Sequence, residues 1–271
     1  MKVLITGGGG FLGSRLAQAL LKKGTLSDSS GKQQPISQIT LFDMAFPDNL
    51  DARLKCVKGD LTDPKLLAEV MGTDTASIFH LASTVSGGAE ADFDLGMRVN
   101  LDGSRALMEG GRKQAVAPRF VFSSSVAAFG FGFPPIVDDH VVALPLNSYG
   151  MQKVCCEYLI NDYSRRGFLD GRVLRLPTIS VRPGKPNLAK SSYASGIIRE
   201  PLNGVHGEER GGQHPLRRVV LVPARVPPPR VHPGEGQHLT DGRPDDVGLP
   251  GALRAGPLPV ARGGDEASTP L

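Results

Sequence analysis

The chain has 271 residues, and its 31 Lys and Arg against 27 Asp and Glu give a formal net charge of +4 without a basic cluster, which argues against a nucleic-acid partner. No apolar run is long enough for a membrane span or a signal peptide, so we expect a cytoplasmic protein with no membrane partner. Cys56, Cys155 and Cys156 have the spacing of neither a disulfide framework nor a zinc site, so we expect buried reduced thiols and no metal.

The chain opens on a strand, a glycine-rich turn and a helix, which we predict over residues 1–23. An apolar run at 3–5 leads to Gly7, Gly10 and Gly13, spaced G-x-x-G-x-x-G, and apolar residues at helical spacing follow. Such glycines allow a tight turn, close approach of a dinucleotide pyrophosphate to the backbone, and close packing of helix on strand. The N–H groups that open the helix would face the phosphates. The turn predicts a dinucleotide site, with a plain glycine-rich turn as the alternative.

A second strand, expected over residues 39–42, ends at Asp43. An acidic residue at this strand end can accept hydrogen bonds from the adenosine ribose, and it would repel a 2′-phosphate, so Asp43 favours NAD over NADP. Its separation from the glycines exceeds the usual one by about ten residues, which a polar surface loop at 25–38 accounts for.

Two further strands, expected over residues 54–57 and 76–79, are each followed by a segment that could touch a cofactor. Asp60 follows the first and could reach the adenine end of a dinucleotide, with a helix-cap or turn aspartate as the alternative. His80 ends the second and is expected to be structural rather than catalytic. The small residues after it would let the backbone lie against the cofactor.

The next helix and strand each contribute one polar feature. Helical spacing over residues 93–111 includes Asn100, which could link the strands to the active site or be a plain polar helix position. A strand over 119–122 leads into three serines, Ser123–Ser125. The carboxyl ends of parallel strands form the ligand crevice of such sheets, so these serines are well placed for chemistry, although ordinary turns are also rich in serine.

A helix starting at residue 148 carries Tyr149 and Lys153, which share one face because they are four residues apart. Oxidation of a secondary alcohol needs a base for the hydroxyl proton, and Tyr149 is the candidate. The ammonium of Lys153 would favour the phenolate and lower the pKa of Tyr149. Ser125 would hydrogen-bond the substrate hydroxyl, with Ser123 and Ser124 as alternatives because the sequence does not fix which side chain faces inward.

A last strand is expected over residues 172–176. The alternation of strands and helices over residues 1–176 therefore predicts an α/β fold with a doubly wound parallel sheet of the Rossmann type. The glycine turn, Asp43, the serines and the Tyr149–Lys153 pair all fall at carboxyl strand ends or helix starts, and this shared placement supports a single site.

Together these motifs resemble the extended short-chain dehydrogenases/reductases of the NAD-dependent epimerase/dehydratase type, over about residues 1–204. The resemblance implies a Rossmann domain over 1–176, NAD as cofactor, a possible homodimer, and catalytic roles for Ser125, Tyr149 and Lys153. The positions expected to bind the cofactor are Gly7, Gly10, Phe11, Leu12, Gly13, Asp43, Asp60, Leu61, Leu81, Ala82, Ser83, Asn100, Tyr149, Lys153 and Pro177.

Segments at 84–94, 161–168, 175–187 and 192–202 are closer to family members that use NAD to oxidise the C2 hydroxyl of a four-carbon sugar acid such as D-erythronate. The resemblance implies that this small-molecule sugar acid is the substrate. A nucleotide-sugar epimerase or dehydratase and a non-catalytic NAD-binding protein are the alternatives. The expected substrate-side residues are Ser86, Ser125, Arg182 and Ser192. Arg182 could bind the carboxylate of the substrate, with a surface ion pair as the alternative.

The composition changes after residue 204. Residues 177–204 are expected to begin a substrate-binding subdomain, which would be truncated or aberrant beyond them. Residues 205–271 hold eleven Pro and eleven Gly, and they lack Lys, Phe, Tyr, Ile, Asn, Met and Cys. The missing residue types have AT-rich codons, so we interpret this tail as a shifted reading frame of a GC-rich gene, with a genuine disordered Pro-rich tail as the alternative.

Overall fold

A computed structural model describes residues 1–204 except 131, 135, 139, 179–180, 183–187 and 190–191. The predicted tail at 205–271 therefore lies outside the described residues, as does part of the expected beginning of the substrate subdomain. In the described part, no helix has the length and apolar character needed to cross a membrane.

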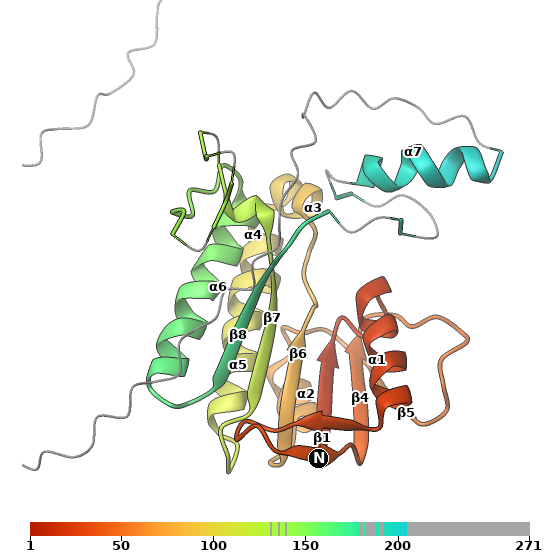
Figure 1. The fold of residues 1–271 in the computed structure, drawn as a ribbon, viewed down its shortest axis with the longest axis vertical. Helices are drawn as coiled ribbons and strands as arrows, with labels where there is room; N and C mark the ends of the chain where they lie inside the picture. Colours follow the sequence, from red (N-terminus) through yellow and green to blue (C-terminus); the bar gives the residue numbers. More distant parts are fainter. Residues whose placement is uncertain are drawn as a thin grey trace, which may run out of the picture. The chain divides into compact units, whose positions relative to one another are not determined.

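Six parallel strands form the central sheet in the order β5-β4-β1-β6-β7-β8 (Figure 1). This is the order 3-2-1-4-5-6 of a dinucleotide-binding sheet once the strands outside the sheet are left aside. The predicted doubly wound sheet is confirmed. The strands are β1 (Lys2–Thr6), β4 (Gln38–Asp43), β5 (Leu54–Lys58), β6 (Thr75–His80), β7 (Arg119–Ser125) and β8 (Asp170–Leu176).

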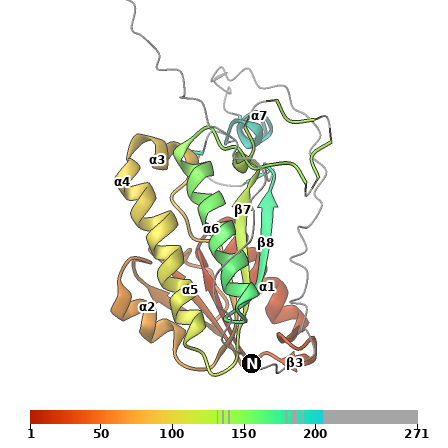
Figure 2. The ribbon, with the colours of Figure 1, turned by 90° about the vertical axis from the view of Figure 1, so that its left-hand side faces the viewer.

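Helices cover both faces of this sheet because side chains alternate along each strand. On β1, Val3 and Ile5 pack in a cluster with α1, whereas Leu4 faces the larger cluster that α2, α5 and α6 complete. Figure 2 shows α1 on one side of the sheet and α2 and α5 on the other. These helices are α1 (Phe11–Lys23), α2 (Pro64–Met71), α5 (Ser104–Arg112) and α6 (Ser148–Arg165).

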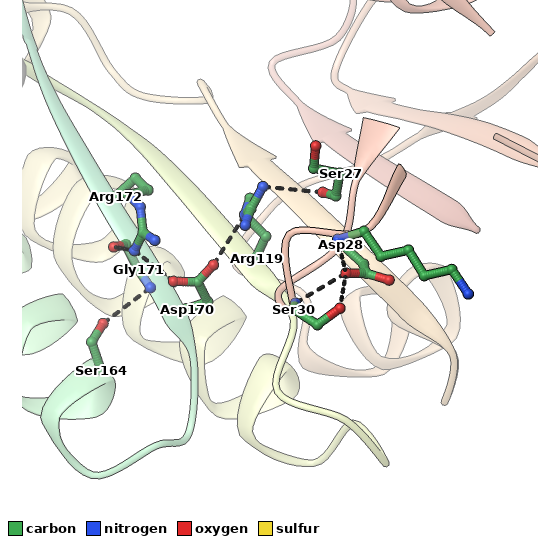
Figure 3. Close-up of polar contacts among 9 residues, drawn as sticks. Ser27, Asp28, Ser30, Arg119, Ser164, Asp170, Gly171 and Arg172 are labelled. Atoms are coloured by element: carbon green, nitrogen blue, oxygen red, sulfur yellow. Dashed lines mark hydrogen bonds and ion pairs between the residues drawn. The ribbon is translucent and has the colours of Figure 1, made fainter. Parts of the chain in front are cut away.

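The expected loop at 25–38 contains a small antiparallel hairpin of β2 (Thr25–Ser27) and β3 (Gln33–Pro35). The ammonium group of Met1 donates to the carbonyl oxygen of Pro35 at 2.6 Å. Arg119 at the start of β7 donates to the carbonyl oxygen of Ser27 at 3.1 Å (Figure 3). These contacts fix the hairpin at the amino end of the sheet, away from the strand ends where the predicted site lies.

The helix expected over 93–111 is divided into three parts. These are α4 (Phe93–Gly96), a π-helix η1 (Met97–Gly103) and α5. The remaining short elements are α3 (Ser86–Ala91), the 3₁₀ turn η2 (Val126–Ala128) and α7 (Ser192–Leu202). The expectation that all thiols are buried is wrong for Cys56, which lies exposed on the edge strand β5.

Candidate active site

The glycine turn lies against the segment that follows β6. Gly7 has a φ of +72°, and a Cβ atom there would lie 2.7 Å from the backbone nitrogen of Ala82. A Cβ atom on Gly13 would lie 2.2 Å from the carbonyl oxygen of Gly7. Both positions thus require glycine, one for its backbone conformation and one for close packing of α1 on the turn. Leu81 is held beside the turn through its N–H, which donates to Thr6 O at 3.1 Å.

The start of α1 is open. Its N-cap, Gly10, provides no side-chain hydrogen bond, and the first turn, which holds Phe11 and Leu12, has no acidic residue. A Cβ atom on Gly10 would meet a single neighbouring atom, the carbonyl oxygen of Gly7, at 3.2 Å. Most helices satisfy these N–H groups with a Ser, Thr, Asp or Asn cap. Their open arrangement here suits an anionic group such as a phosphate.

Asp43 ends β4 over this turn. Its carboxylate accepts from the N–H of Gly9 at 3.0 Å and from the N–H of Met44 at 2.7 Å. The structure therefore brings Asp43 together with the glycine turn despite the hairpin that separates them in sequence. A carboxylate has about four acceptor sites, so it retains the capacity to bind hydroxyl groups.

Asp60 and Leu61 follow β5. Asp60 is exposed, and its carboxylate accepts from the N–H of Thr62 at 2.8 Å, as a turn aspartate does. Leu61 is 6% exposed and packs in the larger core cluster, where a Cβ atom on Gly103 would lie 3.0 Å from its side chain. The helix cap considered for Asp60 is instead supplied by Asp63, which caps α2.

His80 ends β6 and is completely buried between two hydroxyl groups. Its Nδ1 lies 2.7 Å from Thr6 Oγ1, and its Nε2 lies 2.7 Å from Ser104 Oγ. Ser104 already donates to the carbonyl oxygen of Asn100, so it accepts from His80 and thereby assigns the proton to Nε2. Burial, with a smaller effect of the Lys153 charge, lowers the pKa of His80 to about 3. This environment matches the structural role expected for His80.

The structure distinguishes the three serines that end β7. Ser123 donates to the carbonyl oxygen of His80 at 3.1 Å, and Ser124 donates to the carboxylate of Glu157. Ser125 differs because its Oγ accepts from the N–H of Ala127 at 3.1 Å, and the hydroxyl also hydrogen-bonds Tyr149. Of the three predicted alternatives, Ser125 is therefore the one beside Tyr149.

Tyr149 and Lys153 lie on one face of α6, as predicted. Lys153 is 2% exposed, and its Nζ donates to the carbonyl oxygen of Ser123 at 2.8 Å and lies 5.5 Å from the centroid of the Tyr149 ring. Burial lowers the pKa of Lys153 to about 8. Burial also raises the pKa of Tyr149, while hydrogen bonds with Ser83 and Ser125 lower it. The expected lowering of the Tyr149 pKa by Lys153 is thus not seen, because burial dominates.

Asn100 lies in the π-helix η1 and joins two other segments. Its amide accepts from the N–H of Thr84 at 2.7 Å, and donates to the carbonyl oxygen of Thr84 at 3.1 Å and to Gln152 Oε1 at 2.8 Å. Both amide hydrogens are therefore engaged. Asn100 holds the segment after β6 against α6, which is the linking role considered for it.

The substrate-side residues lie on segments that approach one another. Ser86 opens α3, and a Cβ atom on the next residue, Gly87, would lie 2.0 Å from the carbonyl oxygen of Leu188. Arg182 is held through its backbone, which donates to Ser195 Oγ at 3.0 Å and accepts from Arg199 at 2.8 Å. Ser192 opens α7. Pro177, expected at the cofactor, directly follows β8 and is half-buried.

Sequence reasoning missed three residues next to the predicted pair. Gln152 is buried beside Lys153, and Glu157 forms an ion pair with Arg175 of β8 at 2.6 Å. The spacing of four residues between Lys153 and Glu157 was a usable signal for a shared helix face. The pairing of Glu157 with Arg175 depends on how α6 packs against β8, which the sequence does not show.

Comparison with known proteins agrees with this arrangement. Residues 3–209 match the model of the NAD dependent epimerase/dehydratase family. The chain is 60% identical over 206 residues to the D-erythronate dehydrogenase of Cupriavidus necator, a match that covers 76% of this chain and 63% of that protein. It is 48% identical over 211 residues to the D-erythronate dehydrogenase of Haemophilus influenzae, covering 77% of this chain and 64% of that protein.

Among solved structures, a nucleoside-diphosphate-sugar epimerase from Agrobacterium tumefaciens superimposes with a TM-score of 0.67 and 44% identity, covering 75% of this chain and 60% of that one. The chain thus spans less than two thirds of the length of these relatives. The strand order, the glycine turn and the family match lead to one conclusion. The chain belongs to the NAD dependent epimerase/dehydratase family.

Proposed function

We propose that this protein is an NAD-dependent dehydrogenase that oxidises the C2 hydroxyl of a four-carbon sugar acid, such as D-erythronate, to the 2-oxo acid. The observation that carries the proposal is the placement of Ser125, Tyr149 and Lys153 side by side at the carboxyl end of the sheet. The 60% identity to a protein named D-erythronate dehydrogenase supports this substrate class.

The glycine turn fits a dinucleotide. Gly7 and Gly13 leave no room for a side chain, while the open face of Gly10 and the uncapped start of α1 leave room for a pyrophosphate. Asp43 would accept from the adenosine ribose. NAD, when bound, supplies the acceptor for the hydride that leaves C2. The other proposed contacts are Phe11, Leu12, Asp60, Leu61, Leu81, Ala82, Ser83, Asn100, Tyr149, Lys153 and Pro177.

The chain's own residues would manage the proton. Oxidation removes a proton from the substrate hydroxyl while the hydride leaves C2, and the Tyr149 phenolate would take that proton. Ser125 would orient the substrate oxygen, because its hydroxyl lies beside Tyr149 and is fixed by the N–H of Ala127 at 3.1 Å. Lys153, buried on the same face of α6, would hold the nicotinamide ribose. Since burial raises the pKa of Tyr149, the rate should increase with pH on the acid side of its profile.

We propose that the acid end of the substrate binds near Arg182, with Ser86 and Ser192 on the same side. A guanidinium binds a carboxylate bidentately, which suits a sugar acid. We further propose that residues 1–176 form the NAD-binding domain and that residues 177–204 begin the substrate side. We also propose that the protein forms a homodimer and acts in the cytoplasm.

The tail needs its own test. The family match ends at residue 209, which supports the interpretation that the reading frame is shifted from about residue 205. Sequencing the gene from the codon for residue 195 onward tests this. A single-base shift that restores a family-like continuation would support the interpretation, and a confirmed frame without one would contradict it.

The function is tested by the absorbance of released NADH, with D-erythronate and with UDP-sugars as substrates. In a chain with the family-like C-terminus restored, we expect NADH with the sugar acid, none with the UDP-sugars, and loss of the signal in Tyr149→Phe. For the chain as written we expect weaker NAD binding and little turnover. The name of the Agrobacterium structure favours a nucleotide-sugar epimerase as the second candidate. Conversion of a UDP-sugar without NADH release would establish that candidate. NAD binding without either reaction would indicate a non-catalytic NAD-binding protein.

A further inference from the structure

A buried carboxylate lies one helical turn beyond Lys153. Glu157 is 6% exposed, and it accepts from the hydroxyl of Ser124 and from Arg175 Nε and Nη2, the latter at 2.6 Å. Ser124 and Arg175 are opposite each other in the β7–β8 register. Neighbouring residues of β7 and β8 therefore hold the Glu157 carboxylate between them.

The three serines Ser123–Ser125 face three successive turns of α6. Tyr149 lies beside Ser125. Lys153 donates to the carbonyl oxygen of Ser123, and Glu157 accepts from the hydroxyl of Ser124. The spacing of four residues places these helix side chains in one row. Glu157 is thus the third member of the row that contains the proposed base and its lysine.

Glu157 is also the anion that acts on Lys153 at neutral pH. Burial lowers the pKa of Lys153 to about 8, and two groups oppose this effect when they are ionised, Cys156 and Glu157. Burial raises the pKa of the Cys156 thiol to about 11, so that group is uncharged at neutral pH. His80 faces Lys153 from β6 as a neutral imidazole, and the charge of Arg175 on β8 is paired with Glu157.

On the basis of the proposed dehydrogenase, we propose that Glu157 is a positioning residue that keeps Lys153 cationic beside Tyr149, with Ser124 and Arg175 fixing its carboxylate in place. Without this anion, the apolar surroundings of Lys153 favour the neutral amine. A neutral amine would donate a weaker hydrogen bond to the carbonyl oxygen of Ser123 and to the cofactor ribose proposed for it, so the proposed site would lose its order as the pH rises.

The test is an NMR titration of the full chain with lysine labelled by carbon-13 at the ε carbon, in which Lys153→Arg assigns the signal. In Glu157→Gln, which keeps the shape and removes the charge, the titration midpoint of Lys153 should fall by about one pH unit. Ser124→Ala keeps the charge of Glu157 and its pair with Arg175, so it should lower the midpoint by much less than Glu157→Gln does.

The matched control is Glu109→Gln. Glu109 also accepts from a hydroxyl, that of Tyr163, and from a guanidinium, that of Arg112, but it belongs to α5 and exerts no charge effect on Lys153. It should leave the Lys153 midpoint unchanged. Should Glu157→Gln not fold, Glu157→Met combined with Arg175→Met removes the pair without leaving a buried charge, and it must also lower the midpoint.

An unchanged Lys153 midpoint in Glu157→Gln would overturn the inference. So would an equal fall in Ser124→Ala or Glu109→Gln, because loosened packing would then explain it. The titration needs no substrate, so a lowered midpoint would leave the inference intact even where a chain with its C-terminus restored forms no NADH, a result that would refute the dehydrogenase. If NADH is formed, Glu157→Gln should lower kcat with little change in KM, and it should move the alkaline limb to lower pH.

Discussion

The same two strands, β7 and β8, carry an ion pair at each end, and the two ends differ in what the pair does. At the amino end, Arg119 and Asp170 are register partners joined at 3.0 Å, and Arg119 also holds the hairpin through Ser27 (Figure 3). At the carboxyl end, Arg175 pairs with Glu157, which is buried one turn from Lys153.

The two ends of the strands differ in whether each buried charge has a partner of opposite charge. At the amino end, the side chains of Arg119, Asp170 and Arg172 are 22%, 20% and 40% exposed, and each charge has a direct partner. At the carboxyl end, Lys153 is buried with a carbonyl oxygen as its hydrogen-bond acceptor, and His80 is buried as a neutral ring. We infer that the amino end adds stability while the carboxyl end costs stability and holds the reactive groups.

The largest expected effect is acid sensitivity caused by His80. In the folded chain its pKa is about 3, against 6.5 in the unfolded chain, so the unfolded state binds more protons between these values. The free energy of unfolding should therefore fall by about 1.4 kcal/mol for each pH unit below 6.5. Denaturant unfolding at several pH values measures this slope.

The matched variants are His80→Gln and His140→Asn. His140 is exposed, so its replacement should leave the slope unchanged, whereas His80→Gln should reduce it. An equal slope in all three proteins would mean that His80 is not the cause.

The second effect is a gain in stability from Lys153→Met. Burying the ammonium costs free energy below its folded pKa of about 8, and this cost vanishes as the pH approaches 10.5, where the unfolded chain also loses the proton. After the loss of the bond to Ser123, we expect a gain of about 1–2 kcal/mol at pH 7. Chemical denaturation measures it, and a gain that does not shrink toward high pH would contradict the account.

The third effect is a loss of stability when the ion pair at the amino end of the sheet is removed. Arg119→Gln removes the half-buried pair with Asp170 and the bond to Ser27, and it should cost about 1 kcal/mol of unfolding free energy. The affinity for NAD should not change, because the hairpin lies at the opposite end of the strands. Thermal melting and calorimetric titration with NAD separate the two quantities, and a weakened affinity would show that the two ends are not independent.

The smallest effect belongs to a fully solvated pair. Arg165 and Asp162 lie one turn apart at the end of α6, with side chains 71% and 53% exposed. Arg165→Gln should change the unfolding free energy by less than about 0.5 kcal/mol. A larger loss in the same melting experiment would show that exposure is a poor guide to the value of the Arg119 pair.

The sequence predicted the sheet well because each strand is a short apolar run before a polar residue, as at 39–42 before Asp43. It also predicted the helix that begins at Ser148 and the shared face of Tyr149 and Lys153. The hairpin was missed because its strands have no apolar alternation and depend on contacts with Met1 and Arg119.

Parts of the site could not be read from local pattern. The choice of Ser125 among three serines depends on which hydroxyls meet His80 and Glu157, and both partners are distant in sequence. The sign of the Tyr149 pKa shift depends on burial, which the four-residue spacing does not reveal. The linking role of Asn100 likewise depends on contacts with Thr84 and Gln152, which are distant in sequence.

The most direct test of the account is the dissociation constant for NAD of the full chain and of Gly10→Ala, measured by calorimetry. A Cβ atom at Gly10 would meet one atom, the carbonyl oxygen of Gly7 at 3.2 Å, so a small shift of the turn would accommodate it and the melting temperature should fall only slightly. The same methyl group would occupy the space proposed for the pyrophosphate, so we predict that the affinity for NAD falls by about tenfold or more. Equal affinity in the two proteins, or no binding of NAD by the parent, would contradict the proposal that this edge of the sheet is the dinucleotide site.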